Sequence, residues 1–194
     1  MKKILFIILI GFCFIGYAQI PNLNLKNKIK GTVVDLPQSL NQNEICLIYE
    51  INGGWSAYDF IYYYFIKKNG ELNAYKEERP QAYVKNNQLK RTIKTIEPTP
   101  ALKDKILTLI NSGQLTELLK YKQEDFKTEI PELKDFPPMC MISDQNGAKL
   151  MLVQNNKYSS YHYYAPQYYY ENCPDKRINK SVLKKFIDVL DVLR

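Results

Sequence analysis

One stretch of this chain is apolar on both faces of an extended backbone, and it limits the possible folds more than any other feature. The run from Trp55 to Lys67 places two sets of apolar side chains on opposite sides, which are Phe60, Tyr62, Tyr64 and Ile66 against Ile61, Tyr63 and Phe65. Because successive side chains of a strand point to opposite faces, such a strand needs cover on both of them. We therefore expect it inside a sheet. Trp55, at its start, is either an exposed binding anchor beside the Gly53-Gly54 turn or a core side chain, and we favour the core side chain.

Further strands are predicted around this one. Asn69-Gly70 is typical of a two-residue type I′ hairpin turn, because both residue types tolerate a positive φ. Asn52-Gly53-Gly54 predicts another turn, at the end of the preceding strand. The strands predicted for this half of the chain, beside the Trp55–Lys67 run, are Ile45–Ile51, Glu71–Lys76, Gln81–Lys85 and Leu89–Ile96.

The middle of the chain is predicted to form two helices and then a surface loop. Thr99 is a favourable N-cap in front of Pro100, and Gly113 is a typical residue after a helix end. A second, shorter helix is expected over Gln114–Gln123. The charged, proline-containing segment Glu124–Pro138 predicts a loop. The apolar positions that recur at helical spacing in the first helix are Leu102, Ile106, Leu109 and Ile110.

The last third returns to strands and closes with a helix. Asp144–Gly147 and Asn155-Asn156 are turn sequences between short apolar runs, which is the pattern of a meander. Its three predicted strands are Cys140–Ser143, Ala148–Val153 and Lys157–Tyr164. Ser181 is expected to cap a final helix, whose apolar face is formed by Leu183, Phe186, Ile187, Leu190 and Leu193.

These elements together predict an α+β fold. Two strand groups, a hairpin group and a meander, form an antiparallel sheet, and two central helices and a C-terminal helix pack on it. We expect one domain over residues 44–194. An extended lead-in over residues 19–43 precedes it, with a short strand at Gly31–Leu36.

The first 18 residues have the pattern of a secretory signal peptide. Lys2 and Lys3 precede the apolar run Ile4–Ile15, and Gly16-Tyr17-Ala18 offers small residues for cleavage before Gln19. The apolar run is shorter than the roughly 20 residues of a membrane-spanning helix, so no stable span is expected after processing. The sequence therefore predicts a protein exported to the periplasm or the cell exterior.

Cysteine usage agrees with an oxidising compartment. Cys46, Cys140 and Cys173 remain after the predicted cleavage, so one pair can form a disulfide and one thiol is left over. Cys140 and Cys173 flank the C-terminal strand group, whereas Cys46 lies inside a predicted strand. We favour a Cys140–Cys173 disulfide, although the sequence by itself does not fix the pairing.

The charge of the chain is basic but dispersed. The formal net charge is +7, of which Lys2 and Lys3 supply two units. The remaining lysines are scattered and do not form the concentrated basic face that nucleic-acid binding proteins show. Nucleic acid is therefore not an expected partner.

The segment from Tyr158 to Tyr170 is the leading candidate for a binding surface. It holds seven tyrosines in thirteen residues, and tyrosine rings are rigid, amphipathic contacts for sugars and proteins. The competing interpretation is an ordinary strand, because strands also favour tyrosine. The binding residues we predict are Tyr163, Tyr164, Tyr168, Tyr169 and Tyr170.

No catalytic, metal or cofactor site is predicted. His162 is the only histidine of the chain and has no carboxylate near it in sequence, so we interpret it as a structural or surface residue. Several carboxylates lie near predicted strand ends, namely Glu50, Asp59, Glu71, Asp144 and Asp175. Nothing in the sequence identifies two of them as an acid–base pair.

The function that these observations favour is a small exported, non-catalytic binding domain. Its expected partner is an envelope protein or a polysaccharide, contacted through the tyrosine-rich segment. Two alternatives stay open: a hydrolase of cell-wall or extracellular polymers that uses carboxylates, and an inhibitor or immunity protein directed against an exported toxin.

Overall fold

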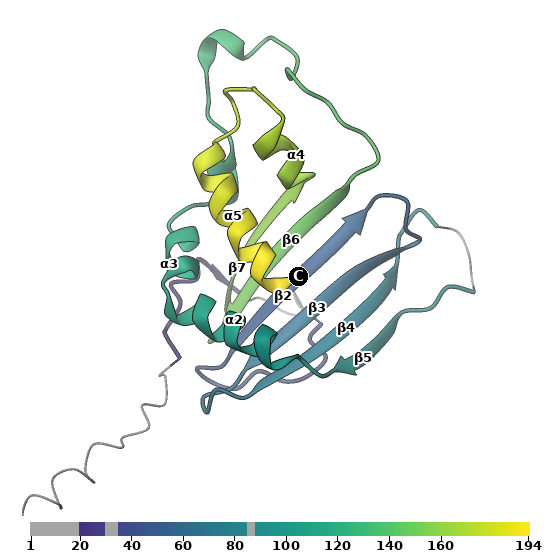
Figure 1. The fold of residues 1–194 in the computed structure, drawn as a ribbon, viewed down its shortest axis with the longest axis vertical. Coiled ribbons are helices and arrows are strands. Elements are labelled where there is room, and N and C mark those ends of the chain that lie inside the picture. Colours follow the sequence, from purple (N-terminus) through teal and green to yellow (C-terminus); the bar gives the residue numbers. More distant parts are fainter. Residues whose placement is uncertain (1–19, 30–34, 85–87) are drawn as a thin grey trace, which may run out of the picture.

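The computed structural model describes residues 20–29, 35–84 and 88–194, and their α+β fold confirms the predicted class. A seven-stranded antiparallel sheet forms one layer and four α-helices form the other (Figure 1). The predicted signal peptide lies outside the described residues, as do residues 31–34 of the strand expected at Gly31–Leu36.

The sheet joins the two predicted strand groups into one layer. The strand order is β1-β7-β6-β2-β3-β4-β5, and all neighbours are antiparallel. The pairing of β2 with β6 places Glu50 opposite Lys149, although these residues are far apart in sequence. The strands are β1 (Asn27–Lys28), β2 (Ile45–Gly53), β3 (Tyr58–Ile66), β4 (Leu72–Pro80), β5 (Thr92–Ile96), β6 (Asn146–Gln154) and β7 (Lys157–Tyr164).

Strand β3 is the strand with two apolar faces, and it lies between β2 and β4, as predicted. Ile61, Tyr63 and Phe65 are buried on one face, and Tyr64 and Ile66 are buried on the other. The sheet therefore needs an apolar layer on each side of β3.

Trp55 is not part of either layer, and its prediction as a core side chain is wrong. Its side chain is 87% exposed. The reason is that β3 begins only at Tyr58, so Trp55 belongs to the loop that follows β2. Gly53 and Gly54 open this loop with positive φ values of 76° and 68°, which turn the chain before Trp55.

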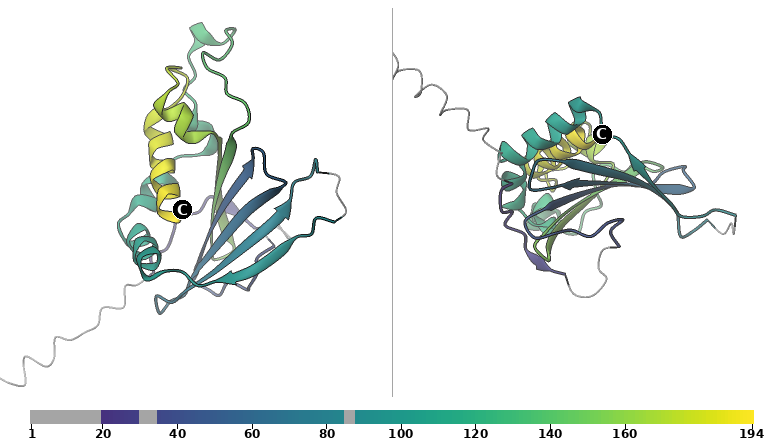
Figure 2. Two further views of the ribbon diagram at one scale, coloured as in Figure 1. Left: turned by 45° about the vertical axis from the view of Figure 1, so that its right-hand side comes forward. Right: turned by 90° about the horizontal axis from the view of Figure 1, so that it is seen from below.

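The helices cover one face of the sheet, as Figure 2 shows. Their buried side chains form the main core together with inward side chains of the sheet such as Tyr49, Leu150 and Tyr161. The helices are α2 (Pro100–Asn111), α3 (Gln114–Leu119), α4 (Pro166–Glu171) and α5 (Lys180–Leu193). Leu23 and Leu25 of the N-terminal segment are buried in the same core.

The helix caps agree with the sequence in one case and differ in another. The Thr99 side chain accepts a hydrogen bond from the Leu102 amide, which confirms Thr99 as the N-cap of α2. For α5 the N-cap is Asn179 rather than Ser181, because the Asn179 side chain accepts from the Val182 amide. Asparagine and serine are comparable N-caps, so the sequence does not decide between them.

The second face of the sheet carries a smaller apolar cluster under the N-terminal segment. Its buried members are Cys46, Ile48, Ile61, Tyr63, Phe65 and Val153. Ile29, Leu36 and Leu40 pack against this cluster from the chain before β2. The lead-in therefore supplies the cover that the second face of β3 requires.

The two asparagine-containing hairpin turns differ from one another. Asn155 and Asn156 have φ values of 51° and 58°, as the two central residues of a type I′ turn require. At Asn69-Gly70 only the glycine has a positive φ, of 77°, and its amide donates to the Lys67 carbonyl at 2.8 Å. The type I′ prediction for Asn69-Gly70 is therefore wrong, while the hairpin between β3 and β4 is confirmed.

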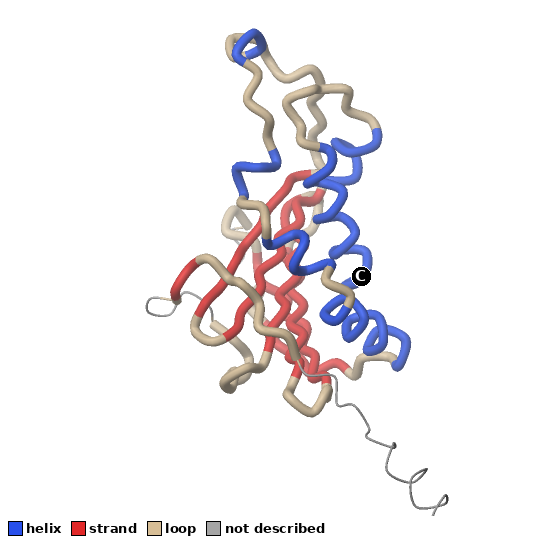
Figure 3. The backbone as a smooth tube through the Cα atoms, turned by 90° about the vertical axis from the view of Figure 1, so that its left-hand side faces the viewer, coloured by secondary structure: helices blue, strands red, loops and turns tan. Residues whose placement is uncertain are grey.

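The predicted three-stranded meander is also wrong in one strand. Residues 140–143 contain no strand, and β6 pairs with β7 on one side and with β2 on the other. Since both sides of β6 are occupied, no place remains next to it for a strand at Cys140–Ser143. Figure 3 shows the chain between α3 and β6 extending past the ends of the strands as a long loop instead.

Two further strand limits differ from the prediction. The Gln81 amide makes the last bond between β4 and the start of β3, to the Ala57 carbonyl, and its side chain turns to the Gly53 carbonyl. The expected strand at Gln81–Lys85 is therefore absent from the described residues 81–84. The last predicted strand of this group, Leu89–Ile96, is shorter and begins at Thr92.

A buried carboxylate fastens β3 and β4 to the chain that precedes β5. Glu77 is fully buried and accepts hydrogen bonds from Tyr63, Arg79 and Arg91 at 2.6, 2.8 and 2.7 Å. Burial by itself raises the pKa of Glu77, but the hydrogen bonds from Arg91, Tyr63 and Arg79 outweigh it. The pKa of this carboxyl therefore lies below its ordinary value.

This network predicts an acid-dependent stability. Breaking a buried ion pair costs about 3 kcal/mol, so we expect Glu77→Gln to destabilise the fold by that amount near neutral pH. Because the folded-state pKa is the lower one, the contribution of Glu77 is complete above the unfolded-state value of about 4.3. It is lost as the pH falls through the folded-state pKa. Urea unfolding across acidic pH should therefore show the difference between wild type and variant shrinking. Glu78→Gln is the control, and a pH-independent difference would contradict the prediction.

Candidate functional site

A groove with an aromatic lining lies at the end of β7. Its volume is about 560 Å³, which falls within the range of typical ligand pockets. Four parts of the chain enclose it: the end of β7, helix α4, the long loop before β6 and the segment before α5. The residues that line it are Gln123, Phe126, Lys127, Pro138, Cys140, His162, Tyr163, Tyr164, Tyr169, Asp175, Arg177 and Ile178.

A sharp bend in the backbone brings the tyrosines of β7 and α4 to this groove. Ala165 has a φ of 44° and a ψ of 52°, which turns the chain directly from β7 into α4. Pro166 is the first residue of α4, where its missing amide hydrogen costs nothing. The prediction that residues after Pro166 leave the sheet is confirmed, and they form a helix.

Tyr163 and Tyr169 form the aromatic floor of the groove with Phe126. The Tyr163 ring lies 5.5 Å from the Phe126 ring and 5.9 Å from the Tyr169 ring, measured between centroids. Burial raises the pKa of Tyr163 to about 12. Tyr163 is therefore uncharged at physiological pH.

The other three tyrosines of the predicted surface occupy different places. Tyr164 lines the groove near its mouth, and its hydroxyl accepts a hydrogen bond from the Gln145 amide at 2.9 Å. Tyr168 lines a separate cavity together with Pro166 and Arg194. Tyr170 packs against the main core. The structure thus brings Tyr163, Tyr164 and Tyr169 together in the lining of the groove. Tyr168 and Tyr170 do not line it, although the Tyr168 ring packs edge-on against the Tyr169 ring, with 5.4 Å between the centroids.

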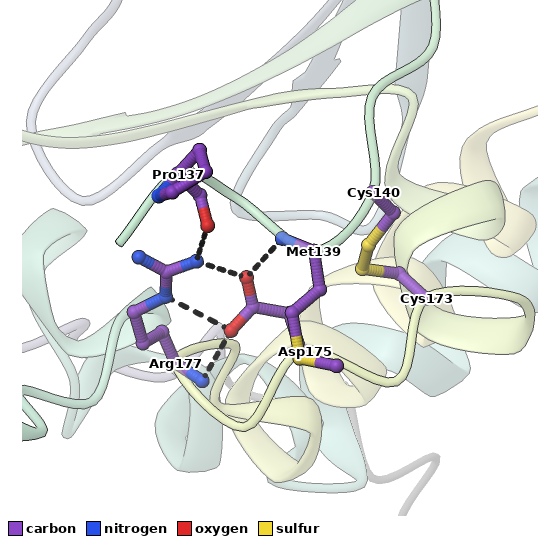
Figure 4. Close-up of a disulfide and its surroundings, with 6 residues drawn as sticks. All are labelled: Pro137, Met139, Cys140, Cys173, Asp175 and Arg177. Atoms are coloured by element: carbon purple, nitrogen blue, oxygen red, sulfur yellow. Dashed lines mark hydrogen bonds and ion pairs between the residues drawn. A yellow bond between two sulfur atoms is a disulfide. The ribbon is translucent and has the colours of Figure 1, made fainter. Parts of the chain in front are cut away.

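One wall of the groove is held by a disulfide and by a buried ion pair (Figure 4). The Cys140–Cys173 disulfide, with Cα atoms 5.8 Å apart, confirms the predicted pairing. Asp175 lies two residues after Cys173 and is 5% exposed. Its carboxylate accepts from Arg177 Nη2 at 2.6 Å and from the Met139 amide at 3.1 Å. Hydrogen bonds from Arg177 hold the pKa of Asp175 well below its usual range.

The Arg177 guanidinium connects this carboxylate to the long loop. It donates to the carbonyls of Phe136 and Pro137 at 2.9 Å each, and to the Leu133 carbonyl at 3.3 Å. A planar guanidinium with several fixed donors can serve all these acceptors at once, which a lysine cannot. The loop wall is therefore fixed by two independent restraints, one covalent and one ionic.

The Gln123 side chain is hydrogen-bonded to the outer edge of β7 beside the groove. Its side-chain amide donates to the His162 carbonyl at 2.8 Å, and its side-chain oxygen accepts from the His162 amide at 2.7 Å. The imidazole of His162 is exposed, which agrees with its interpretation as a surface residue. Phe126 and Gln123 belong to the short 3₁₀ turn η1 (Gln123–Phe126), in the segment predicted as helix and loop.

The predicted carboxylates do not converge in the groove. Glu71 pairs with Lys67 in a hairpin, and Asp175 is engaged by Arg177. Glu50 and Asp59 do lie on neighbouring strands, and burial raises the pKa of Asp59. The cavity beside Glu50 is about 90 Å³, smaller than a typical ligand pocket. Within the described ranges no group of three or more potential metal ligands occurs.

The residues that sequence reasoning missed lie mainly in the long loop. Phe136, Met139 and Met141 are exposed apolar side chains close to the wall of the groove. The sequence indicates Asp175 only as one of several carboxylates near predicted strand ends, and it gives no sign of a role for Arg177. The signal that could have indicated the wall is an Asp-x-Arg sequence next to Cys173, together with a proline-rich loop next to Cys140.

The disulfide indicates an oxidising, exported environment. Cys46 is buried, and burial raises the pKa of its thiol well above the ordinary value, so it is unreactive where it lies. None of the helices in residues 20–29, 35–84 and 88–194 has the length and apolarity needed to cross a bilayer. Comparisons with protein-family models and with curated proteins return no match to this chain.

The contribution of the Arg177 guanidinium to the loop wall can be tested by a substitution that keeps its charge. Arg177→Lys keeps the positive charge but cannot reach Asp175 and the loop carbonyls together. We expect the loop around residues 133–139 to be cut at least several-fold faster by a protease in this variant, because it opens locally more often. Lys176→Ala changes a neighbouring exposed charge and serves as the control. Equal cleavage rates for wild type and Arg177→Lys would show that the guanidinium does not hold the loop.

Proposed function

We propose that this chain is an exported, non-catalytic binding protein whose groove receives part of another envelope protein. The observation that carries the proposal is a preformed groove of about 560 Å³ with an aromatic floor and a restrained wall. A site that is rigid before binding loses less conformational entropy when a ligand enters. The disulfide and Arg177 are suited to provide that rigidity.

The chemistry of the groove favours an apolar part of a protein over a sugar. Phe126, Tyr163, Tyr169, Pro138 and Ile178 provide apolar or aromatic surface. Asp175 and Arg177 are already bonded to one another and to the loop. A sugar needs hydrogen-bond partners for most of its hydroxyls, because buried polar groups without partners are costly. An aromatic or aliphatic side chain needs only a matching cavity.

The surroundings of the groove support the same partner class. Phe136, Met139 and Met141 are 63%, 63% and 80% exposed on the loop that forms the wall. Methionine and aromatic side chains are enriched where proteins contact one another, and exposed apolar groups mark such contacts. They would surround the inserted side chain with further apolar contact.

Export to the periplasm or the cell exterior is part of the proposal. The N-terminal sequence pattern and the disulfide both support it. We expect protein purified from the producing cells to come from an exported fraction, to begin at Gln19 and to contain the Cys140–Cys173 bridge. Intact-mass and peptide mass spectrometry measure both properties. Protein that starts at Met1 and is recovered from cytosol with reduced thiols would contradict this location.

Neighbouring tyrosines of α4 allow a matched test of the groove. Tyr169 lines the groove, whereas Tyr168 lines a different cavity and contacts the groove only through the Tyr169 ring. Truncation of a central aromatic anchor typically costs about 2 kcal/mol, or about 30-fold in affinity. We therefore expect Tyr169→Ala to lose the partner recovered from envelope extract by wild type, and Tyr168→Ala to retain it. Circular dichroism and thermal unfolding establish that both variants fold.

The same experiment separates the alternatives. Equal recovery by both variants would overturn the groove as the binding site. A polysaccharide in place of a protein among the recovered material would change the partner class. Recovery of an exported toxin would assign the protein to the inhibitor or immunity class. The hydrolase alternative depends on Glu50 and Asp59, and a carboxylate-dependent cleavage of envelope polymer by wild type would favour it.

A further inference from the structure

We infer that the groove binds an extended, acidic segment of its partner protein, which joins the sheet as an added strand along the outer edge of β7. This assignment rests on the proposed function and specifies its ligand. It combines three features of the groove: an unpaired strand edge, a side chain that imitates a neighbouring strand, and an unbalanced positive charge.

The outer edge of β7 is only partly covered. Strand β1 pairs with Lys157 and Tyr158, and just before β1 the Lys26 amide donates to the Ser159 hydroxyl rather than to the backbone of β7. The Ala165 amide donates toward β6, to the Asn146 carbonyl, while the Asn156 carbonyl accepts from Ile29 on the outer side. Since peptide groups alternate in direction along a strand, those of Ser160, His162 and Tyr164 also face outward.

Gln123 occupies the middle one of these three outward positions. Its side-chain amide gives one hydrogen bond to the His162 peptide and accepts another from it, at 2.8 and 2.7 Å. These are the two bonds that a residue of an adjacent strand makes in an antiparallel pair. Within the part of the chain that the structure describes, the peptide groups of Ser160 and Tyr164 have no comparable partner. An entering strand would replace Gln123 and pair with all three positions.

The groove lies beside this edge, so an added strand would have room for its side chains. His162, Tyr163, Tyr164 and Gln123 line the groove as well as forming or closing the edge. Alternate side chains of an added strand would point to the aromatic floor of Phe126, Tyr163 and Tyr169. The partner segment should therefore have apolar residues at every second position. Main-chain bonds and side-chain pockets act together in this way when a peptide is added to a sheet edge.

The charge of the groove specifies the remaining positions. Asp175 and Arg177 neutralise one another. Lys127 also lines the groove, and it has no ion pair among the described residues. Among its lining residues the groove therefore has one positive charge without an ion-pair partner, on a chain whose formal charge of +7 falls to +5 when Lys2 and Lys3 are removed with the signal peptide. An acidic residue in the partner segment would be attracted to this position.

The other edge of the sheet does not offer an equivalent site. Strand β5 is exposed along most of its length, and Lys94 stands at its middle. A lysine on an edge strand is a common device against the addition of further strands. Residues 159–164 of β7 contain no lysine. The β7 edge is thus the one that combines an accessible backbone with a neighbouring cavity.

Short synthetic peptides with alternating apolar and acidic residues are the probe for this inference, with the mature chain as the receptor. We expect such peptides to bind at least tenfold more tightly than scrambled peptides of the same composition. Binding should slow amide hydrogen exchange at Ser160 and Tyr164. It should be lost in Tyr169→Ala and kept in Tyr168→Ala. Lys127→Gln should weaken it several-fold.

Methylation of peptide backbone nitrogens provides the decisive comparison. Methyl groups on the nitrogens that face β7 remove main-chain hydrogen bonds and should weaken binding at least tenfold. Methyl groups on the alternate nitrogens should have little effect. Gln123→Ala removes the competing side chain and should strengthen binding several-fold, whereas a purely structural Gln123 would leave binding unchanged or weaker.

The possible failures are distinguishable. If the peptides bind in a Tyr169-dependent manner but methylation has the same effect at both sets of positions, strand addition is wrong and the proposed binding function stands. If no alternating peptide binds while the envelope partner is still recovered through Tyr169, the inference is likewise overturned. If an oligosaccharide protects Tyr164 and the peptides do not, both the inference and the protein-binding proposal fail.

Discussion

The antiparallel pairing of β2 with β6 is the constraint on which the rest of the structure depends. It joins a four-strand group, formed early in the chain, to a hairpin formed almost 100 residues later, through eight residue pairs from Cys46–Val153 to Gly53–Asn146. This junction makes the sheet wide enough for α2, α3 and α5 to pack on one face. It also places the end of β7 beyond the helices, where the long loop can fold back over it. The groove exists because β6 and β7 are anchored at this position.

Local sequence predicts those structural features that interactions between neighbouring residues determine. Thr99 caps a helix and Asn155-Asn156 turns a hairpin, because each depends on neighbouring residues alone. The place of β3 inside the sheet is also predictable, because its own sequence is apolar on both faces. The structural predictions that are wrong have a different cause. Cys140–Ser143 has the composition of a strand, but the place beside β6 belongs to β2. Such competition between distant segments is not visible in a single sequence, where tertiary context overrides propensity.

The composition of the tyrosine-rich segment indicates a region of interest but does not predict the role of each tyrosine in it. Seven tyrosines that look alike in sequence have distinct roles in space. Tyr161 is buried, and its hydroxyl donates to carbonyls near the end of α3. Tyr163, Tyr164 and Tyr169 line the groove, while Tyr168 and Tyr170 do not. The bend at Ala165 makes this division, and alanine is not a residue whose sequence context predicts a positive φ.

The positive φ of Ala165 has a further consequence for the site. A non-glycine residue in this region costs of order 1 kcal/mol, so it persists only where the surroundings require it. Here the Ala165 amide is bonded to β6 while its carbonyl accepts from the Tyr169 amide in α4. Helix α4 is in turn tied to the long loop through the Cys140–Cys173 disulfide, and the loop is tied to Arg177. The aromatic floor and the loop wall are thus parts of one restrained unit. A unit restrained in this way has little conformational freedom left to lose, which agrees with the binding role proposed for the groove.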